Sequence, residues 1–138
     1  MVKGRYAEDA ILREVLTEDP RAARLAEQIR GADPDATREL RMQLGEIVNN
    51  AIAAKRKEDT RALGDAVAGQ VTASKVRPPT HELDAVYTAF LVETGAAEGL
   101  EQAMERLARD WGGRIQLRLI GPLAAYDFTG TAAPTMEG

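Results

Sequence analysis

A helical pattern of unusual length, from Asp33 to about Gln70, most constrains what this chain can fold into. Its apolar residues recur with the spacing that places side chains on one face of a helix. They are Leu40, Leu44, Ile47, Val48, Ala51 and Ile52, followed by Leu63, Ala66 and Val67. At a rise of about 1.5 Å per residue, such a helix runs roughly 50 Å, well beyond the radius of gyration of roughly 13 Å for a domain near this size. We therefore expect the helix either to bend near Gly45 or Gly64, or to project past the domain body and offer a surface to a partner.

Shorter patterns precede this helix. Val2–Tyr6 alternates as a short strand does, and a helical stripe follows from Glu8. Asp19-Pro20 and Asp33-Pro34 each place a capping side chain before a proline, which predicts that a helix begins at each pair. We therefore expect one strand and two helices before or at the start of the long helix.

Strand patterns return after the long helix. Gln70–Val76 is short and half polar, Asp84–Val92 is apolar on both faces, and Ile115–Leu119 alternates. A third clear helix lies between the last two, from Gly95 to Trp111, and its apolar face should pack on the core. The order of elements predicts an α+β protein, an expanded ferredoxin-like (split β-α-β) domain with a long helical insertion between its first and second strands.

Composition narrows the class of protein. A length of 138 residues suits a single domain, which we place at residues 2–128, with a flexible tail at residues 129–138. No apolar run approaches the roughly 20 residues that a membrane-spanning helix needs. The absence of cysteine excludes disulfides and thiolate chemistry and fits a cytoplasmic protein. A formal net charge of −4 disfavours general nucleic-acid binding, which depends on neutralising phosphates.

His81 is the only histidine and the one candidate for catalysis. Glu82 and Asp84 are near it in sequence, so a small ferredoxin-like enzyme that uses His81 remains an alternative. A solvated loop histidine explains the same residues more simply. No phosphate-binding loop, HExxH motif or calcium-binding loop is present, so we expect no cofactor, no metal and no enzymatic activity.

Basic residues recur along the long helix, and they leave a second alternative open. They are Arg38, Arg41, Lys55, Arg56, Lys57 and Arg61. A regulatory or nucleic-acid-binding module could use such a stripe. However, acidic residues such as Glu46 and Glu58 interrupt it, and it contains no aromatic residue on which bases could stack. A solvated helix face with pairs of opposite charge is the simpler interpretation.

The stretch IQLRLIGPLAAYDF, from Ile115 to Phe128, holds two of only six aromatic residues in the chain. Tyr126 and Phe128 follow the last predicted strand. They either fold back to complete the core or are offered to a partner.

Several motifs in the second half resemble a known family. A predicted strand ending in Ala89-Phe90-Leu91-Val92 precedes a helix, a strand and the ending Gly121-Pro122…Tyr126…Phe128. This order is similar to that of the C-terminal part of the gas vesicle accessory proteins F and L. Leu44-Gly45-Glu46 matches the family's middle region, and the resemblance covers about residues 2–128.

The chain departs from this family in two respects. Leu123-Ala124-Ala125 stands where members usually carry Trp-Pro-Pro, so a rigid turn fixed by proline is not expected there. No counterpart of the family's N-terminal α/β domain is recognisable. We therefore expect either an excised domain or a short member.

The resemblance implies a non-enzymatic accessory role in gas vesicle assembly. It implies binding to the gas vesicle shell protein, to other gas vesicle accessory proteins, or to both, in the cytoplasm and in association with the vesicle. From the composition and charge we expect no membrane and no nucleic-acid partner, and the oligomeric state stays open. The candidate partner-binding residues are Gly121, Pro122, Tyr126, Phe128, Lys55 and Arg56.

Overall fold

The computed structural model describes residues 1–120, 124–128 and 133–136, and side chains within residues 1–120. Its helices are α1 (Glu8–Glu18), α2 (Pro20–Ile29), α3 (Arg38–Val67) and α4 (Ala97–Asp110), with a short 3-10 helix at Thr94–Ala96. Its strands are β1 (Val2–Tyr6), β2 (Ala73–Val76), β3 (Asp84–Leu91), β4 (Ile115–Ile120), β5 (Ala124–Phe128) and β6 (Ala133–Met136). The prediction of an α+β protein is confirmed.

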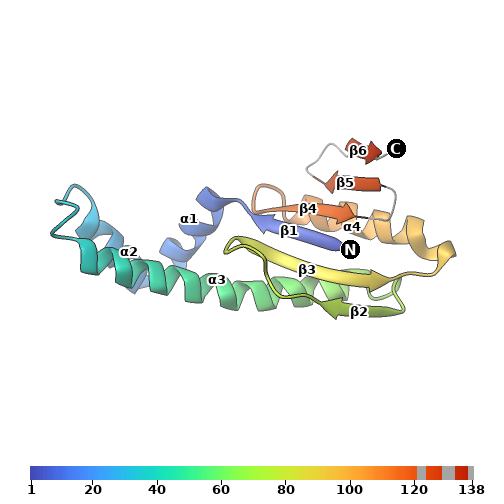
Figure 1. Ribbon diagram of the computed structural model, residues 1–138, viewed down its shortest axis with the longest axis horizontal. Helices are drawn as coiled ribbons and strands as arrows, with labels where there is room; N and C mark the ends of the chain where they lie inside the picture. Colours follow the sequence, from blue (N-terminus) through green and yellow to red (C-terminus); the bar gives the residue numbers. More distant parts are fainter. Residues whose placement is uncertain (121–123, 129–132, 137–138) are drawn as a thin grey trace.

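The strands form one sheet in the order β2-β3-β1-β4-β5-β6 (Figure 1). Every neighbouring pair is antiparallel. The first strand of the chain lies inside the sheet, where Val2 pairs with Thr88 of β3 on one side and with Leu119 of β4 on the other. Segments more than a hundred residues apart therefore meet in the middle of the fold.

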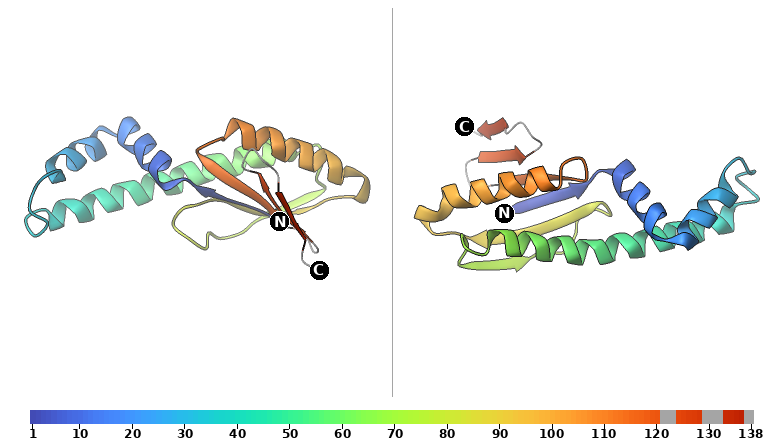
Figure 2. Two further views of the ribbon diagram at one scale, coloured as in Figure 1. Left: turned by 90° about the horizontal axis from the view of Figure 1, so that it is seen from above. Right: turned by 180° about the vertical axis from the view of Figure 1, so that it is seen from behind.

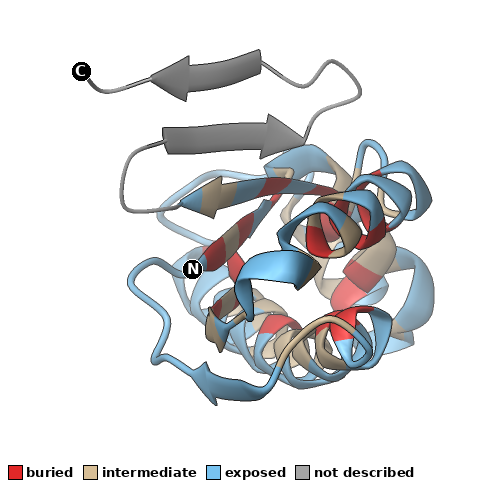
Figure 3. Cartoon of the chain, turned by 90° about the vertical axis from the view of Figure 1, so that its right-hand side faces the viewer, coloured by how far each residue is buried: buried red, intermediate tan, exposed pale blue. Residues whose placement is uncertain are grey.

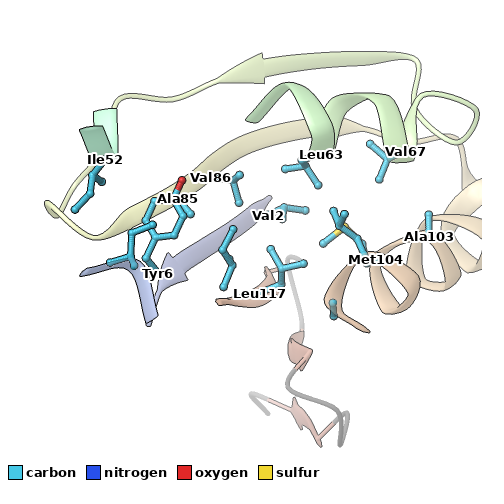
Figure 4. Close-up of a cluster of buried hydrophobic side chains, with 14 of the residues drawn as sticks. Val2, Tyr6, Ile52, Leu63, Val67, Ala85, Val86, Ala103, Met104 and Leu117 are labelled. Carbon is cyan, nitrogen blue, oxygen red and sulfur yellow. The ribbon is translucent and has the colours of Figure 1, made fainter. Parts of the chain in front are cut away.

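Helices α3 and α4 lie side by side on one face of this sheet (Figure 2). The inward positions of the strands alternate with exposed ones, and these inward side chains meet the buried stripes of the two helices. Val2 and Leu117 from the strands, Leu63 from α3 and Met104 from α4 contribute to this core (Figure 4). Buried residues concentrate between the sheet and these helices, whereas β2 is exposed along its whole length (Figure 3).

The long helix is continuous through Gly45 and Gly64 and projects past the sheet, which decides between the two expectations from the sequence (Figure 1). Its 30 residues span roughly 45 Å. The helix α2 packs beside the projecting half. We call α2 and residues 38–51 of α3 the helical arm.

The start of the long helix differs from the prediction. The Asp33 carboxylate accepts a hydrogen bond from the Asp35 N–H at 3.0 Å, and a separate turn follows before α3 begins at Arg38. Asp33 therefore stabilises a local turn instead of capping the helix. The prediction for Asp19 is confirmed, because its side chain accepts from the N–H groups of Arg21 and Ala22 at the start of α2.

The second predicted strand is shorter than expected. The Gln70 N–H donates to the Val67 carbonyl at the end of α3, and the strand itself begins only at Ala73. At the other end of the sheet, β6 falls within the segment predicted to be a flexible tail. Residues 129–132 and 137–138 lie outside the described residues, and the flexible tail stays a prediction.

The end of α4 at Asp110, with Trp111 as its cap, agrees with the helix predicted to reach Trp111. Gly113 has a φ of 78°, a conformation that costs glycine little and other residues more. Trp111, at the end of α4, is half-buried and packs against the core as predicted.

Candidate functional site

A partly buried polar network joins the helices to the sheet. The Tyr6 hydroxyl donates to Asp59 Oδ2 at 2.5 Å, and Arg114 Nη1 donates to Asp59 Oδ1 at 3.0 Å. The same guanidinium donates to both Glu14 oxygens, from Nε to Oε1 at 3.0 Å and from Nη2 to Oε2 at 3.1 Å. We call Tyr6, Glu14, Asp59 and Arg114 the anchor network. It links β1, α1, α3 and the residue before β4, and so fixes how the helices leave the sheet.

The electrostatics of the anchor network favour a structural role. Burial and the hydrogen bond to Asp59 raise the pKa of the Tyr6 phenol, so the phenol stays protonated. Burial acts to lower the pKa of Arg114, but hydrogen bonds to Asp59 and Glu14 outweigh it and hold that pKa above its usual value. Neither group is poised to exchange a proton near neutral pH.

Lys55, one of the predicted partner-binding residues, extends the anchor network. Its ammonium group lies 3.4 Å from Glu14 Oε2 and 2.5 Å from Glu18 Oε2. Burial acts to lower the pKa of Lys55, but these carboxylates outweigh burial and raise it. Lys55 is thus paired inside the chain, and partner binding through it stays a prediction.

Arg56, the next predicted residue, holds the start of β3. Its Nε donates to the Asp84 carbonyl at 2.6 Å, and its Nη2 donates to the Glu82 carbonyl at 3.0 Å. These bonds occupy two donors of the guanidinium. A partner role for Arg56 also stays a prediction.

His81 lies in a turn that Asp84 organises. One Asp84 oxygen accepts from the Thr80 N–H and hydroxyl, both at 2.7 Å, and from the His81 N–H at 3.2 Å. Burial acts to raise the pKa of Asp84, but the bonds from Thr80 outweigh it and lower that pKa. His81 Nδ1 accepts a hydrogen bond from the Leu83 N–H at 3.1 Å, so the imidazole ring also stabilises the turn. The Asp84 carboxylate, one of the two that made His81 a catalytic candidate, is therefore engaged in holding the backbone of the turn.

A groove lies between α3 and the segment that follows β2. Its cavity of about 560 Å³ is lined by four cationic residues, Arg56, Lys57, Arg61 and Arg77. Its apolar lining comes from Val76, Pro78, Pro79, Val86 and Tyr87, and Thr60 and Asp84 complete the wall. We call this the basic groove. A cavity of this size falls in the range that holds small ligands or short peptide segments.

The helical arm presents a second surface. Met42 is 66% exposed, and the apolar residues of the α2–α3 seam are mostly only half-buried. A cavity of about 540 Å³ lies at the base of the arm, where Pro20 begins α2 and faces Ala51 and Ala54 of α3. The arm therefore leaves apolar surface accessible outside the core.

The predicted C-terminal surface is described only in part. Tyr126 and Phe128 belong to β5, where they pair with Leu119 and Leu117 of β4. These two residues therefore extend the sheet beyond β4, and β6 pairs with β5 in turn. Gly121 and Pro122 lie outside the described residues.

Neither a metal site nor a membrane span emerges from the described residues. In the ranges with described structure, no group of three or more His, Asp or Glu side chains is arranged to hold a metal ion. None of the helices in those ranges has the length and apolar character needed to cross a membrane.

The family described as Gas vesicle synthesis protein GvpL/GvpF matches residues 1–130. The chain belongs to this family. Gas vesicle protein F from Streptomyces sp. (strain CB03234) is similar to it, with 32% identity over 128 residues. The match covers 92% of this chain and 52% of that protein, so this GvpL/GvpF chain spans about half the length of that relative.

Two solved GvpF structures resemble the fold of this GvpL/GvpF chain. The crystal structure of GvpF from Anabaena sp. PCC7120 matches with a TM-score of 0.66 and 15% identity, over 85% of this chain and 47% of that one. GvpF from Microcystis aeruginosa matches with a TM-score of 0.58 and 12% identity, over 85% and 48%. At these identities the likeness shows a shared α+β fold.

Two features of this GvpL/GvpF chain escaped the sequence patterns. Arg77 joins Lys57 and Arg61 at one groove, although the sequence pattern groups only the cations of the long helix. Asp59 lies in the buried stripe of α3 beside Tyr6 and Arg114. A carboxylate at a core position of the helix, together with an arginine just before a strand, was the available signal for the anchor network.

Proposed function

We propose that this chain is a non-enzymatic accessory protein of gas vesicle assembly, which acts in the cytoplasm and associates with the vesicle. It binds the gas vesicle shell protein, other gas vesicle accessory proteins, or both. The observation that carries this proposal is the family match over residues 1–130. The family is a gas vesicle protein family and not a known enzyme family.

The geometry around His81 supports a non-enzymatic role. To act as a base, His81 would need the Asp84 carboxylate to orient it. That carboxylate instead accepts hydrogen bonds from the Thr80 N–H, the Thr80 hydroxyl and the His81 N–H. A base needs an orienting partner and a nucleophile within reach. The turn uses these groups for its own stability, which favours binding over catalysis.

The helical arm supports a holding function. An assembly factor has to cover apolar surface of a shell subunit until that subunit joins the shell, and a helix with accessible apolar residues can do so. Met42 is the most exposed large apolar side chain of the described residues and lies on the projecting half of α3. The strand β5, which carries Tyr126 and Phe128, is the second candidate surface.

We further propose that residues 2–128 form one expanded ferredoxin-like domain. Read from β4, the first four strands have the order β4-β1-β3-β2, with helices connecting β1 to β2 and β3 to β4. This arrangement is typical of a split β-α-β plan, with α1, α2 and the projecting half of α3 as the insertion.

Co-purification with the shell protein tests the proposal. We expect a tagged intact chain, co-expressed with a gas vesicle shell protein, to retain that protein, and a chain truncated before Gly121 to retain less. Because truncation removes paired strands, Met42→Glu serves as a second variant that leaves the sheet intact. Gln43→Glu, which adds the same charge at the neighbouring exposed position, is its matched control.

We expect Met42→Glu to lower shell-protein recovery severalfold and Gln43→Glu to leave it unchanged. Absence of the shell protein from the eluate of the intact folded chain would refute direct binding to it. Equal recovery with Met42→Glu and Gln43→Glu would remove the arm as the contact surface.

A further inference from the structure

We infer that the basic groove is a docking site for an acidic and aliphatic segment of a partner protein, one in which carboxylates alternate with apolar side chains. Docking at the basic groove holds or fails separately from the gas vesicle role, because it can be tested with a peptide alone.

The first observation is a set of cations without internal partners. The side chains of Lys57, Arg61 and Arg77 make no ion pair or hydrogen bond within the part of the chain that the structure describes. Asp65, one turn beyond Arg61 on α3, is exposed and is not bonded to it. By contrast, Lys55 and Arg114 are paired with carboxylates.

The spacing of these cations makes their clustering costly without a ligand. Lys57 and Arg61 are four residues apart, so they lie on the same face of α3, where like charges repel. Arg77 faces them from the segment after β2 across the same cavity. The chain as a whole carries a formal charge of −4, so this local excess of positive charge runs against the balance of the molecule. An anionic ligand would relieve the repulsion.

The one carboxylate at the groove does not neutralise it. Asp84 is only 1% exposed, and its Oδ2 is taken by Thr80 and His81. Its Oδ1 lies 3.5 Å from Arg5 Nε. The charge of Asp84 is thus directed into the turn and toward β1, and the three cations remain available to an incoming carboxylate.

The apolar wall of the groove favours a peptide over a nucleic acid. Val76 is 60% exposed and stands with Pro78 and Pro79 beside the cations, which suits aliphatic side chains that flank a carboxylate. A single-stranded nucleic acid would need aromatic faces for its bases. Tyr87 is the only aromatic among the lining residues, and Lys3 Nζ already lies 5.1 Å from its ring centre.

Binding of a labelled peptide to the full chain tests the inference by fluorescence anisotropy. The probe is a short peptide of alternating glutamate and leucine, compared with its lysine and leucine counterpart and with a single-stranded oligonucleotide. The variants are Arg61→Glu and Arg77→Glu. Arg106→Glu, an equal charge change at an exposed site of α4, is the matched control. Val76→Ser tests the apolar wall without changing charge, and circular dichroism confirms that each variant is folded.

We expect the acidic peptide to bind, and Arg61→Glu or Arg77→Glu to weaken it at least about tenfold, because each removes a charge-assisted contact. We expect Val76→Ser to weaken it severalfold and Arg106→Glu to leave it within about twofold.

The inference is overturned if Arg106→Glu weakens binding of the acidic peptide as much as Arg61→Glu does, or if the basic peptide binds equally well. Tighter binding of the oligonucleotide through the same residues would assign the groove to nucleic acid. Self-association that depends on Arg61 would assign it to a second copy of this chain. Either outcome would also overturn the inference.

Discussion

The hydrogen bond between Tyr6 and Asp59 tests whether the anchor network holds the helices on the sheet. Asp59→Ala leaves the buried Tyr6 hydroxyl without its acceptor, which costs about 1–3 kcal/mol. Arg114 also loses one carboxylate, but it keeps Glu14 and its side chain is 26% exposed, so water limits this cost to about 1 kcal/mol. We therefore expect Asp59→Ala to lower the free energy of unfolding by about 2–4 kcal/mol.

A double-mutant cycle isolates the bond itself. Tyr6→Phe removes the hydroxyl and leaves Asp59 paired with Arg114, so we expect a loss of about 1 kcal/mol. If the two groups stabilise the fold through each other, the double variant should lose about 1–2 kcal/mol less than the sum of the single variants.

Urea unfolding provides the measurement. Trp111 is the only tryptophan and packs half-buried against the core, so its fluorescence reports the transition, and circular dichroism checks that the helices unfold with it. Glu58→Ala, at the exposed neighbouring position of α3, is the matched control and should stay within about 0.5 kcal/mol of the parent. Losses of Tyr6→Phe and Asp59→Ala that simply add would refute the argument, because they would mean that the two groups act independently.

Three further changes probe other parts of the fold by the same measurement. Hydrogen bonds from Thr80 hold the pKa of Asp84 below the usual value of an aspartate, so Asp84 contributes stability that is present above the unfolded-state pKa and is lost as the pH falls through the lower folded-state pKa. When urea unfolding is measured at decreasing pH, we expect the free energy of unfolding to fall less steeply for Asp84→Asn than for the parent chain. An equally steep fall would contradict this role of Asp84. A Cβ at Gly4 would lie 2.8 Å from Val86 Cγ2, so Gly4→Ala should cost about 1–3 kcal/mol, whereas Gly45→Ala, with nothing within 4 Å, should be neutral or stabilising. Leu63 is fully buried, so Leu63→Ala should cost about 2–5 kcal/mol, and a loss below about 1 kcal/mol would show that the site is not part of the core.

Sequence periodicity was sufficient to predict most of the helices and strands, because the residues of each element themselves determine which of its faces is buried. Alternation in Val2–Tyr6 and Ile115–Leu119, and the apolar stripes of the helices, follow from which face each residue must bury. The start of α3 could not be predicted in the same way. Asp33 has two local uses, as a helix cap or in a turn, and only the geometry of the Asp33–Thr37 segment selects the turn.

The candidate surfaces were harder to predict because they depend on contacts between distant segments. Lys55 and Arg56 are adjacent on one helix, yet one pairs with α1 and the other holds the segment before β3 and its first residue. The basic groove exists only because the segment with Arg77 returns beside α3. A single sequence shows which residues are basic, but not which of them lack a partner once the chain is folded.

The position of β1 between β3 and β4 has a consequence for biosynthesis. The ribosome makes β1 before the other strands of this sheet, yet β1 can complete its pairing only after β4 has emerged, since Val2 pairs with Leu119. The contacts among α1, α2 and α3 are closer in sequence and are available much earlier. The helical arm should thus be formed on the nascent chain while the sheet is still open. A partner that recognises the arm could then engage the protein before translation has finished.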